Sequence, residues 1–220
     1  MKVAIIGASG KTGTELVRES LKRVYQVVAV CRHSSVEKLD EFKYCDGFKV
    51  MTSTVVSDEA TLTQALDGCD AVVAVLIAVR RLKATELVTS LIKATAANGV
   101  KRLVFTAGEV TAVREEGEAY TLRQRFMLAL IPLVMRLTPY SVKDMLKASV
   151  MVGKQPDWDW TIVRAPTLRE TPPVGYRFCK ISEITSAHAL SREDYAACLL
   201  DSLGKSEYHR QTLTVMPADS

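Results

Sequence analysis

The sequence predicts an α/β fold, a Rossmann-type doubly wound parallel sheet in one domain that covers residues 1–220. Apolar runs of strand length alternate with helical segments through the first half of the chain. A glycine-rich loop joins the first of these strands to the first helix. The chain has 220 residues, of which 48% are hydrophobic and 25% charged, as in an ordinary globular domain.

The first half reads as five strands with helices between them. The strands are expected at residues 3–6, 26–31, 48–51, 71–76 and 102–106. Their continuous apolar runs are typical of parallel strands that are buried on both faces. Helices are expected from Thr14, over residues 58–66 and over residues 84–98, where Gly99 is a suitable C-cap.

The second half is less regular. Residues 122–137 and 142–152 read as helices, 160–163 as a sixth strand and 212–215 as a last short strand. Residues 171–175 form a turn-rich loop, and a further helix begins after the N-cap Ser191. We expect this part to form a small subregion that covers the substrate at the carboxyl edge of the sheet.

Composition excludes several classes of function. With 29 Lys and Arg against 25 Asp and Glu, the net charge is +4, too weak and too dispersed to indicate nucleic acid binding. The longest apolar run, residues 126–135, is about half of the ~20 residues of a membrane span. Five scattered cysteines predict reduced thiols and a cytoplasmic protein, and three separate histidines give no metal site.

The loop of residues 7–13 has glycines at every third position, between a strand and a helix. Gly7 permits a tight turn, Gly10 lets a phosphate approach the backbone, and Gly13 lets the helix pack against the strand. The context favours a dinucleotide site over an ordinary glycine turn. We expect pyrophosphate contacts from Gly7, Ser9, Gly10, Lys11, Thr12 and Gly13.

The residues after the second strand indicate which dinucleotide binds. A carboxylate there would bind the ribose hydroxyl of NAD, whereas an arginine accommodates the 2′-phosphate of NADP. Here the strand is followed by Arg32, whose guanidinium can bind a phosphate, and by Ser34 and Ser35, whose hydroxyls can donate to it. The next carboxylate is Glu37. The sequence therefore predicts a preference for NADP(H) over NAD(H).

Several blocks carry a family resemblance over almost the whole chain. They are residues 7–13, 30–32, 66–73, 99–104, 159–166 and 184–196. The sequence resembles the NAD(P)H-binding, NmrA-like atypical short-chain dehydrogenases, and among these the group of flavin reductase and biliverdin-IX-beta reductase. The block 159–166 is the most specific of these motifs to that group.

The resemblance implies a nicotinamide cofactor lying across the carboxyl edge of the sheet. By position, the strand ends at Leu76 and Ile77 would lie near the adenosine and ribose, and Arg80 would reach a phosphate. Thr106 and Ala107 would lie beside the nicotinamide. The residues that would close over it are Ala165, Pro166 and Thr167.

The sequence also departs from its relatives. A Gly-Asp pair expected after the third strand is replaced here by residues 52–55, which leaves Thr54 or the backbone to contact the adenine. Ala107 stands where relatives often have serine. Neither Lys143 nor Lys147 lies four residues after Tyr140, so the Tyr-x-x-x-Lys pair is missing.

Two functions of different class follow. The first is an NADPH-dependent reductase that transfers a hydride to an aromatic small molecule such as a flavin, quinone or tetrapyrrole, because such acceptors need no dedicated protein acid. Its candidate catalytic residues are Thr106, with Tyr140 and Lys147 as alternatives. The second is a non-catalytic NADP(H)-binding redox sensor or assembly protein of NmrA-like type. A nucleotide-sugar epimerase is disfavoured by the short chain.

Residues 122–137 leave two interpretations open. The first is a partly buried helix whose arginines extend to solvent. The second is an apolar lid or dimer surface whose arginines attract an anionic substrate. The oligomer is expected to be a monomer or a homodimer.

Overall fold

The first seven strands of an eight-stranded sheet run parallel in the order β3-β2-β1-β4-β5-β6-β10, and β8 pairs antiparallel with β10 at the edge. The computed structural model describes residues 1–76, 83–108, 121–122, 125–126, 129–130, 141–184 and 188–219. The strands of this sheet are β1 (Lys2–Ile6), β2 (Gln26–Arg32), β3 (Phe48–Ser53), β4 (Ala71–Ala74), β5 (Arg102–Gly108), β6 (Asp159–Ala165), β8 (Tyr176–Phe178) and β10 (Gln211–Pro217). This is the doubly wound fold that the sequence predicted, with one antiparallel edge strand added.

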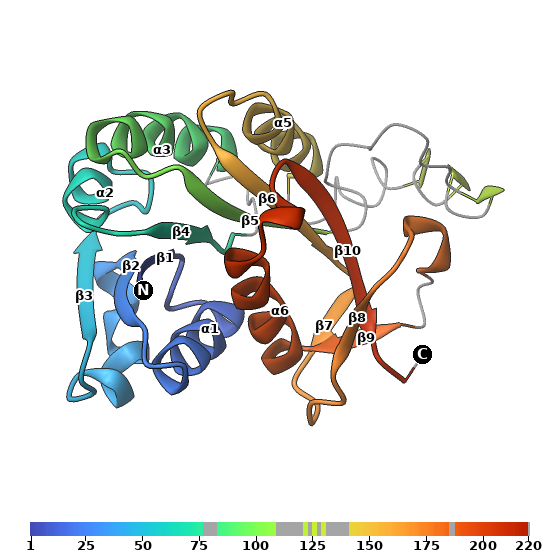
Figure 1. Ribbon diagram of the computed structural model, residues 1–220, viewed down its shortest axis with the longest axis horizontal. Helices are drawn as coiled ribbons and strands as arrows, with labels where there is room; N and C mark the ends of the chain where they lie inside the picture. The colour runs from blue at the N-terminus through green and yellow to red at the C-terminus, as the bar shows by residue number, and fades with distance from the viewer. Residues whose placement is uncertain are drawn as a thin grey trace.

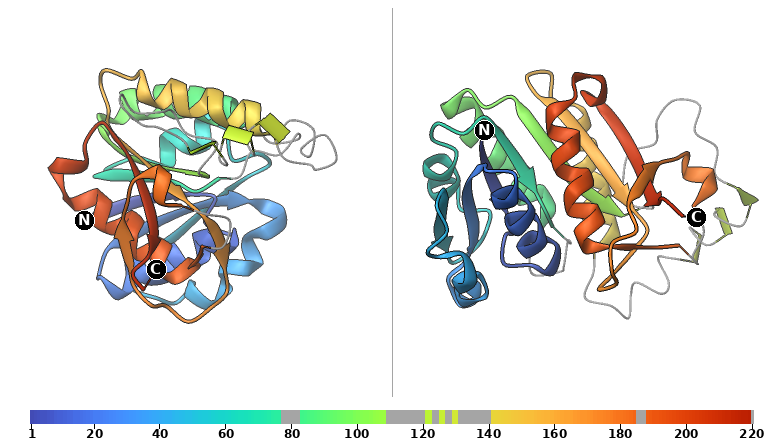
Figure 2. Two further views of the ribbon diagram at one scale, coloured as in Figure 1. Left: turned by 90° about the vertical axis from the view of Figure 1, so that its right-hand side faces the viewer. Right: turned by 60° about the horizontal axis from the view of Figure 1, so that its bottom comes forward.

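Helices cover both faces of the sheet (Figures 1 and 2). One face is covered by α2 (Glu59–Ala65), α3 (Ala84–Asn98) and α5 (Val142–Gly153). The other is covered by α1 (Lys11–Lys22), α6 (Arg192–Gly204) and the 3-10 helix η1 (His33–Phe42). Alternate residues of each strand therefore enter two separate apolar cores, which explains the continuous apolar runs of β1 and β4.

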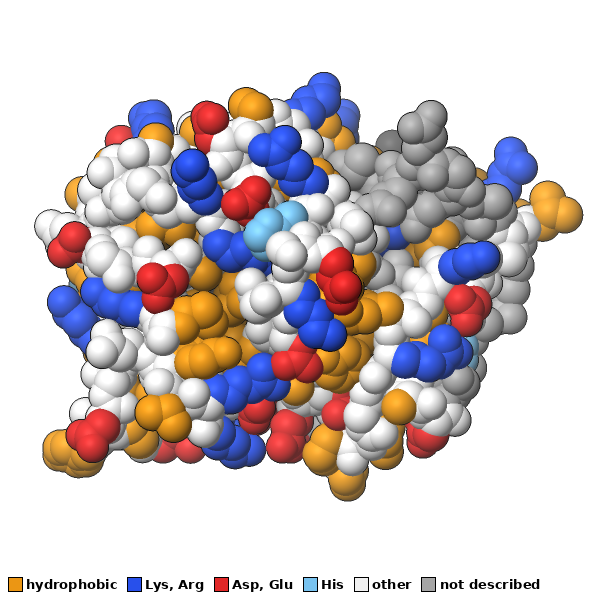
Figure 3. Space-filling model, viewed as in Figure 1, with side chains coloured by type: hydrophobic (Ala, Val, Ile, Leu, Met, Phe, Trp, Pro, Cys, Tyr) orange, Lys and Arg blue, Asp and Glu red, His pale blue; other side chains and the backbone are white. Residues whose placement is uncertain are grey.

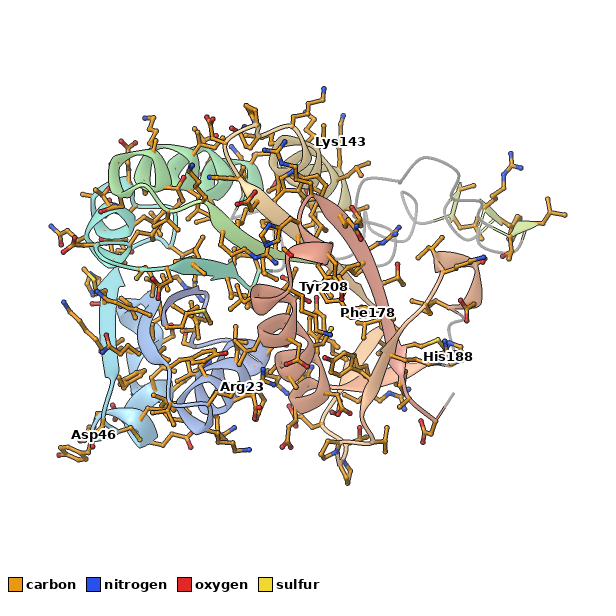
Figure 4. All side chains as sticks on the ribbon, in the orientation of Figure 1. Arg23, Asp46, Lys143, Phe178, His188 and Tyr208 are labelled. Carbon is orange, nitrogen blue, oxygen red and sulfur yellow. The ribbon has the colours of Figure 1, made fainter. Side chains whose placement is uncertain are left out.

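Helices α1 and α6 pack against one another on the same face. Near their carboxyl ends, Arg23 Nη1 lies 2.6 Å from Asp201 Oδ1, and Figure 4 shows Arg23 at the boundary between the two helices. The hydroxyl of Tyr176 also donates to Asp201. Helices α1 and α6 are thus joined near their carboxyl ends. Their amino ends lie together at the carboxyl edge of the sheet.

A buried arginine also binds the carboxyl end of α6. Arg102 of β5 donates to the carbonyls of Ser202 and Leu203, in the last turn of α6, and to Thr161 Oγ1 and the Asp159 carbonyl on β6. Burial lowers the pKa of Arg102 to about 10, so its side chain remains charged at neutral pH. It satisfies helix carbonyls that would otherwise be left unpaired.

The C-terminal part contains three short strands that the sequence did not predict. Besides β8, these are β7 (Thr167–Arg169) and β9 (Ala189–Ser191), which form a separate parallel pair. The aromatic rings of Phe178 and Tyr208 meet edge to face at 5.1 Å, and Figure 4 labels both. Each of these strands has only three residues, too few to display a strand period.

Most predicted elements lie within two or three residues of their observed bounds. Helix α3 covers the predicted residues, and Gly99 caps it with a φ of 68°. The fourth strand was predicted through residue 76 but ends at Ala74, and the Leu76 amide donates to the Thr106 hydroxyl instead of to a strand carbonyl. Most of the predicted helix over residues 122–137 lies outside the described residues.

Candidate functional site

The glycine loop lies at the point where the strand order of the sheet reverses, between β1 and β4. Gly7 has a φ of 84°, and a Cβ at this position would lie 2.2 Å from the carbonyl oxygen of Val75. Its amide donates to the carbonyl of Val30 at 3.0 Å. In open α/β sheets ligands bind at this reversal point, so the loop opens onto the expected crevice.

The other two glycines of the loop have different roles. A Cβ on Gly13 would lie 2.3 Å from the carbonyl oxygen of Gly7, so this glycine is needed for the helix to pack against the loop. A Cβ on Gly10 would meet the Gly7 oxygen at 3.3 Å and Gly10 is exposed. Gly10 therefore leaves open space at the amino end of α1, as the approach of a phosphate requires.

The amino end of α1 has no side-chain cap. Gly10 is its N-cap residue, and the first turn contains no acidic side chain. In contrast, Asp58 caps α2, Ser141 caps α5 and Ser191 caps α6 through side-chain oxygens. The first backbone N–H groups of α1 thus remain available to an anion at the positive end of the helix dipole.

A pocket of about 670 Å³ extends from this helix end over the carboxyl ends of β4, β5 and β6. Its lining residues are Gly10, Lys11, Thr12, Gly13, Val75, Leu76, Thr106, Ala107, Gly108, Ala165, Pro166, Leu168, Arg192 and Tyr195. The end near α1 is polar, and the end near β5 and β6 is mostly apolar. This arrangement matches a ligand with a charged phosphate portion and a flat, less polar ring.

Thr106 lines the pocket, and its hydroxyl forms hydrogen bonds with the end of the neighbouring strand β4. The hydroxyl donates to the carbonyl of Ala74 at 3.2 Å and accepts the amide of Leu76, also at 3.2 Å. Thr106 is 5% exposed. Its hydrogen is therefore used in this structure to hold the chain where it leaves β4.

Sequence reasoning missed two pocket residues on α6, Arg192 and Tyr195. The Tyr195 hydroxyl donates to the Val163 carbonyl at 2.8 Å, and burial raises the pKa of Tyr195 well above its ordinary value. It is therefore a neutral phenol that fixes α6 against β6 below the pocket. The N-cap Ser191 was the available signal, because it predicts that a helix begins at Arg192.

Arg32 ends β2, and its side chain is exposed. It adjoins the glycine loop through a partly buried contact. The hydroxyls of Ser9 and Ser35 are 2.8 Å apart, and Ser35 donates to the carbonyl of Arg32 at 3.2 Å. Ser34, which the sequence suggested as a ligand, is exposed beside this contact. The described residues include no carboxylate in an ion pair with Arg32.

The remaining predicted residues are spread more widely. Thr54 is exposed just beyond β3, and Thr167 is exposed while its neighbour Leu168 lines the pocket. Lys147 is exposed on α5 and does not line the pocket. The predicted residues Ile77, Arg80 and Tyr140 lie outside the described residues.

Within the described ranges no cluster of three metal-ligating side chains occurs. In the same part of the chain no helix is long and apolar enough to cross a membrane.

The sequence matches one family model over residues 7–206, that of the NAD(P)H-binding family. A short match also links it to an uncharacterized protein of Bacillus subtilis, 51% identical over 35 residues. That match covers 16% of this chain and 16% of the Bacillus protein.

Solved structures share the fold over nearly the whole chain. A short-chain dehydrogenase/reductase of Veillonella parvula, in complex with NADP, has a TM-score of 0.75 at 17% identity and covers 97% of this chain and 93% of its own. An anaerobillin reductase of Escherichia coli O157:H7 has a TM-score of 0.75 at 15% identity, covering 100% and 98%. An oxidoreductase of Lactococcus lactis has a TM-score of 0.72 at 15% identity, covering 99% and 91%.

Proposed function

This chain belongs to the NAD(P)H-binding family, and from that membership we propose that it is an NADPH-dependent oxidoreductase of a small aromatic acceptor. The single observation that carries the proposal is the pocket itself. It joins the uncapped amino end of α1 to an apolar wall at the ends of β5 and β6. The whole of residues 1–220 is proposed to form this one NAD(P)-binding domain.

The polar half of the pocket suits the pyrophosphate of the cofactor. The backbone N–H groups of the first turn of α1 donate to it, and Gly10 gives it room. Lys11 and Thr12 add an ammonium and a hydroxyl at the same place. The residues present therefore fit a dinucleotide phosphate.

The apolar half suits the nicotinamide and the acceptor ring. When bound, the reduced cofactor supplies a hydride to the acceptor and leaves oxidised, and water supplies the proton. Ala107, Ala165 and Pro166 are small or flat side chains against which a ring packs without steric conflict. Tyr195 and Thr106 keep these strand ends fixed, so the chain contributes proximity of the two rings.

The preference for NADPH is proposed from Arg32. A guanidinium at the end of β2, close to the glycine loop, forms charge-assisted hydrogen bonds with a 2′-phosphate that NADH lacks. The NADP-bound structure of the Veillonella relative supports the same choice of cofactor.

A direct test is to add FMN, riboflavin and a series of quinones to the protein with NADPH and follow the loss of absorbance of the reduced cofactor. The proposal predicts turnover with at least one of these acceptors and faster turnover with NADPH than with NADH. A linear tetrapyrrole should be included, because a relative of the same fold is an anaerobillin reductase. Cofactor binding without turnover of any acceptor would contradict the enzyme proposal.

A second function is favoured by one observation, the use of the Thr106 hydroxyl in holding β4. Among the described residues that line the pocket, the other two hydroxyls belong to Thr12 and Tyr195. The Tyr195 hydroxyl donates to the Val163 carbonyl. A pocket with so few available protons suits a non-catalytic NADP(H) sensor that binds a partner protein. The sensor predicts different affinities for reduced and oxidised cofactor and no acceptor turnover.

We further propose a reducing, cytoplasmic compartment for this protein. All five cysteines are free, and Cys31, Cys69 and Cys198 are buried. Figure 3 shows basic and acidic side chains interspersed over the visible face, which favours small-molecule ligands over nucleic acid. The proposed assembly is a monomer or homodimer, which sedimentation would distinguish.

A further inference from the structure

The amino ends of α1 and α6 each begin with a cation, and the two cations share one carboxylate. Lys11 is the first residue of α1 and Arg192 the first of α6. Glu170 Oε1 lies 2.6 Å from Lys11 Nζ and 3.8 Å from Arg192 Nη1. Glu170 belongs to the loop after β7, far from both helices in sequence.

This cluster lies at the junction of two cavities. Lys11 and Arg192 line the cofactor pocket, and they also line an adjoining cavity of about 420 Å³. Glu170 lines the second cavity only, together with Arg169 and Glu193. The carboxylate therefore meets the two cations in the second cavity.

The electrostatic environment favours an anion at this position. The Lys11 ammonium keeps the pKa of the Glu170 carboxyl below its ordinary value, and Arg192 acts in the same direction. The uncapped N–H groups of α1 begin beside Lys11 and add the positive end of the helix dipole. The Glu170 carboxylate thus lies next to the amino end of α1, where the positive charges would stabilise an anionic oxygen of a ligand most strongly.

We propose that Lys11 and Arg192 form a phosphate-binding pair for the cofactor pyrophosphate, and that Glu170 is a built-in competitor that lowers cofactor affinity. The inference rests on the proposed function, since it concerns the same pocket. When the pyrophosphate binds at the end of α1, the two cations turn from Glu170 towards it. The ion pair with Glu170 is lost at that moment, and its loss reduces the binding free energy.

The expected size of the effect is modest. The side chains of Lys11 and Glu170 are 71% and 66% exposed, so solvent screens their attraction. Exposed ion pairs contribute little, so we expect the cofactor affinity to change only about two- to fivefold. Such a change lies within the resolution of a fluorescence or calorimetric titration.

The test is a titration of NADPH and NADH into the full-length protein and its variants. Glu170→Gln keeps the shape of the side chain and removes its charge, and we expect it to tighten both cofactors about two- to fivefold. The affinities for NADPH and NADH should increase equally, because both cofactors contain the pyrophosphate. The gain should shrink in high salt and disappear when Lys11→Met is combined with Glu170→Gln.

Glu193→Gln is the matched control. Glu193 lines the same cavity, but it forms an ion pair with Lys22 at 3.6 Å, whereas Lys11 pairs with Glu170. A smaller gain than that of Glu170→Gln supports the inference, whereas an equal gain would assign the effect to general charge and contradict it. Unchanged or weaker binding by Glu170→Gln overturns the inference while leaving the proposed function intact. Binding of neither cofactor by any variant would contradict both.

Discussion

The hydroxyls of Ser9 and Ser35 lie 2.8 Å apart and join the glycine loop to η1, which follows β2. This contact connects the two parts of the chain that would hold the pyrophosphate and the 2′-phosphate. Ser35 is 6% exposed, and its hydroxyl donates to the carbonyl of Arg32. The relative position of the loop and Arg32 is therefore fixed before any cofactor binds.

Variants of Ser35 and Ser34 distinguish a residue that positions Arg32 from a residue that contacts NADPH. Ser35→Ala removes the buried bond and should lower the free energy of unfolding by about 0.5–1.5 kcal/mol, measured by urea denaturation. It should also weaken NADPH binding, because Arg32 loses its support. Ser34→Ala changes an exposed side chain, so its stability should remain unchanged while NADPH binding weakens. A stability loss in Ser34→Ala as large as that in Ser35→Ala would contradict this assignment.

The glycine loop gives a second pair of variants. Gly13→Ala places a methyl group 2.3 Å from the Gly7 carbonyl oxygen, which should destabilise the protein by about 1–3 kcal/mol. Gly10→Ala meets the same oxygen only at 3.3 Å, so the fold should be retained. Its methyl group fills the approach of the phosphate, and cofactor affinity should fall about 10-fold or more. Thermal unfolding and NADPH titration of both variants check this; normal binding by folded Gly10→Ala would disprove the role of Gly10.

Arg102→Met should destabilise the protein strongly. The substitution preserves an unbranched side chain but leaves the carbonyls of Ser202 and Leu203 without their donor. A loss of roughly 2–4 kcal/mol is expected in a denaturant titration. Lys101→Met, at the exposed neighbouring position, is the control and should cost less than about 0.5 kcal/mol.

Asp144 of α5 caps the amino end of α3, and removing its carboxylate should lower the stability of the protein measurably. Its carboxylate accepts the Ala84 amide at 2.6 Å and the Thr85 hydroxyl at 2.7 Å, at the start of α3. Asp144→Ala should therefore cost about 1–2 kcal/mol of stability. Asp157→Ala, an exposed carboxylate in the loop before β6, should be near neutral. Equal losses would indicate that the cap contributes nothing.

The first half of the fold could be predicted from the sequence because its elements are long and regular. The buried strands β1, β2 and β4 are continuous apolar runs, and α3 has a helical period and a glycine cap. The glycine loop was located for the same reason, since its spacing and its place between strand and helix are both local features.

The missed features depend on contacts between distant parts of the chain. Arg102 reads as an ordinary residue at the start of a strand, and only the packing of α6 against β5 gives it carbonyls to bind. Arg192 and Tyr195 enter the pocket because α6 lies beside α1, which no local pattern shows. The strand β7 has three residues and lacks a period, so the position of Glu170 could not be predicted.

We propose that Arg32 selects NADPH at a dinucleotide pocket on the carboxyl edge of the sheet. The most direct measurement is the ratio of NADH to NADPH dissociation constants for the natural protein and for Arg32→Ala. We predict that Arg32→Ala weakens NADPH by about 10- to 100-fold, as for lost charge-assisted hydrogen bonds, and changes NADH less than about twofold. Equal weakening of both cofactors, or an unchanged ratio, would contradict the claim.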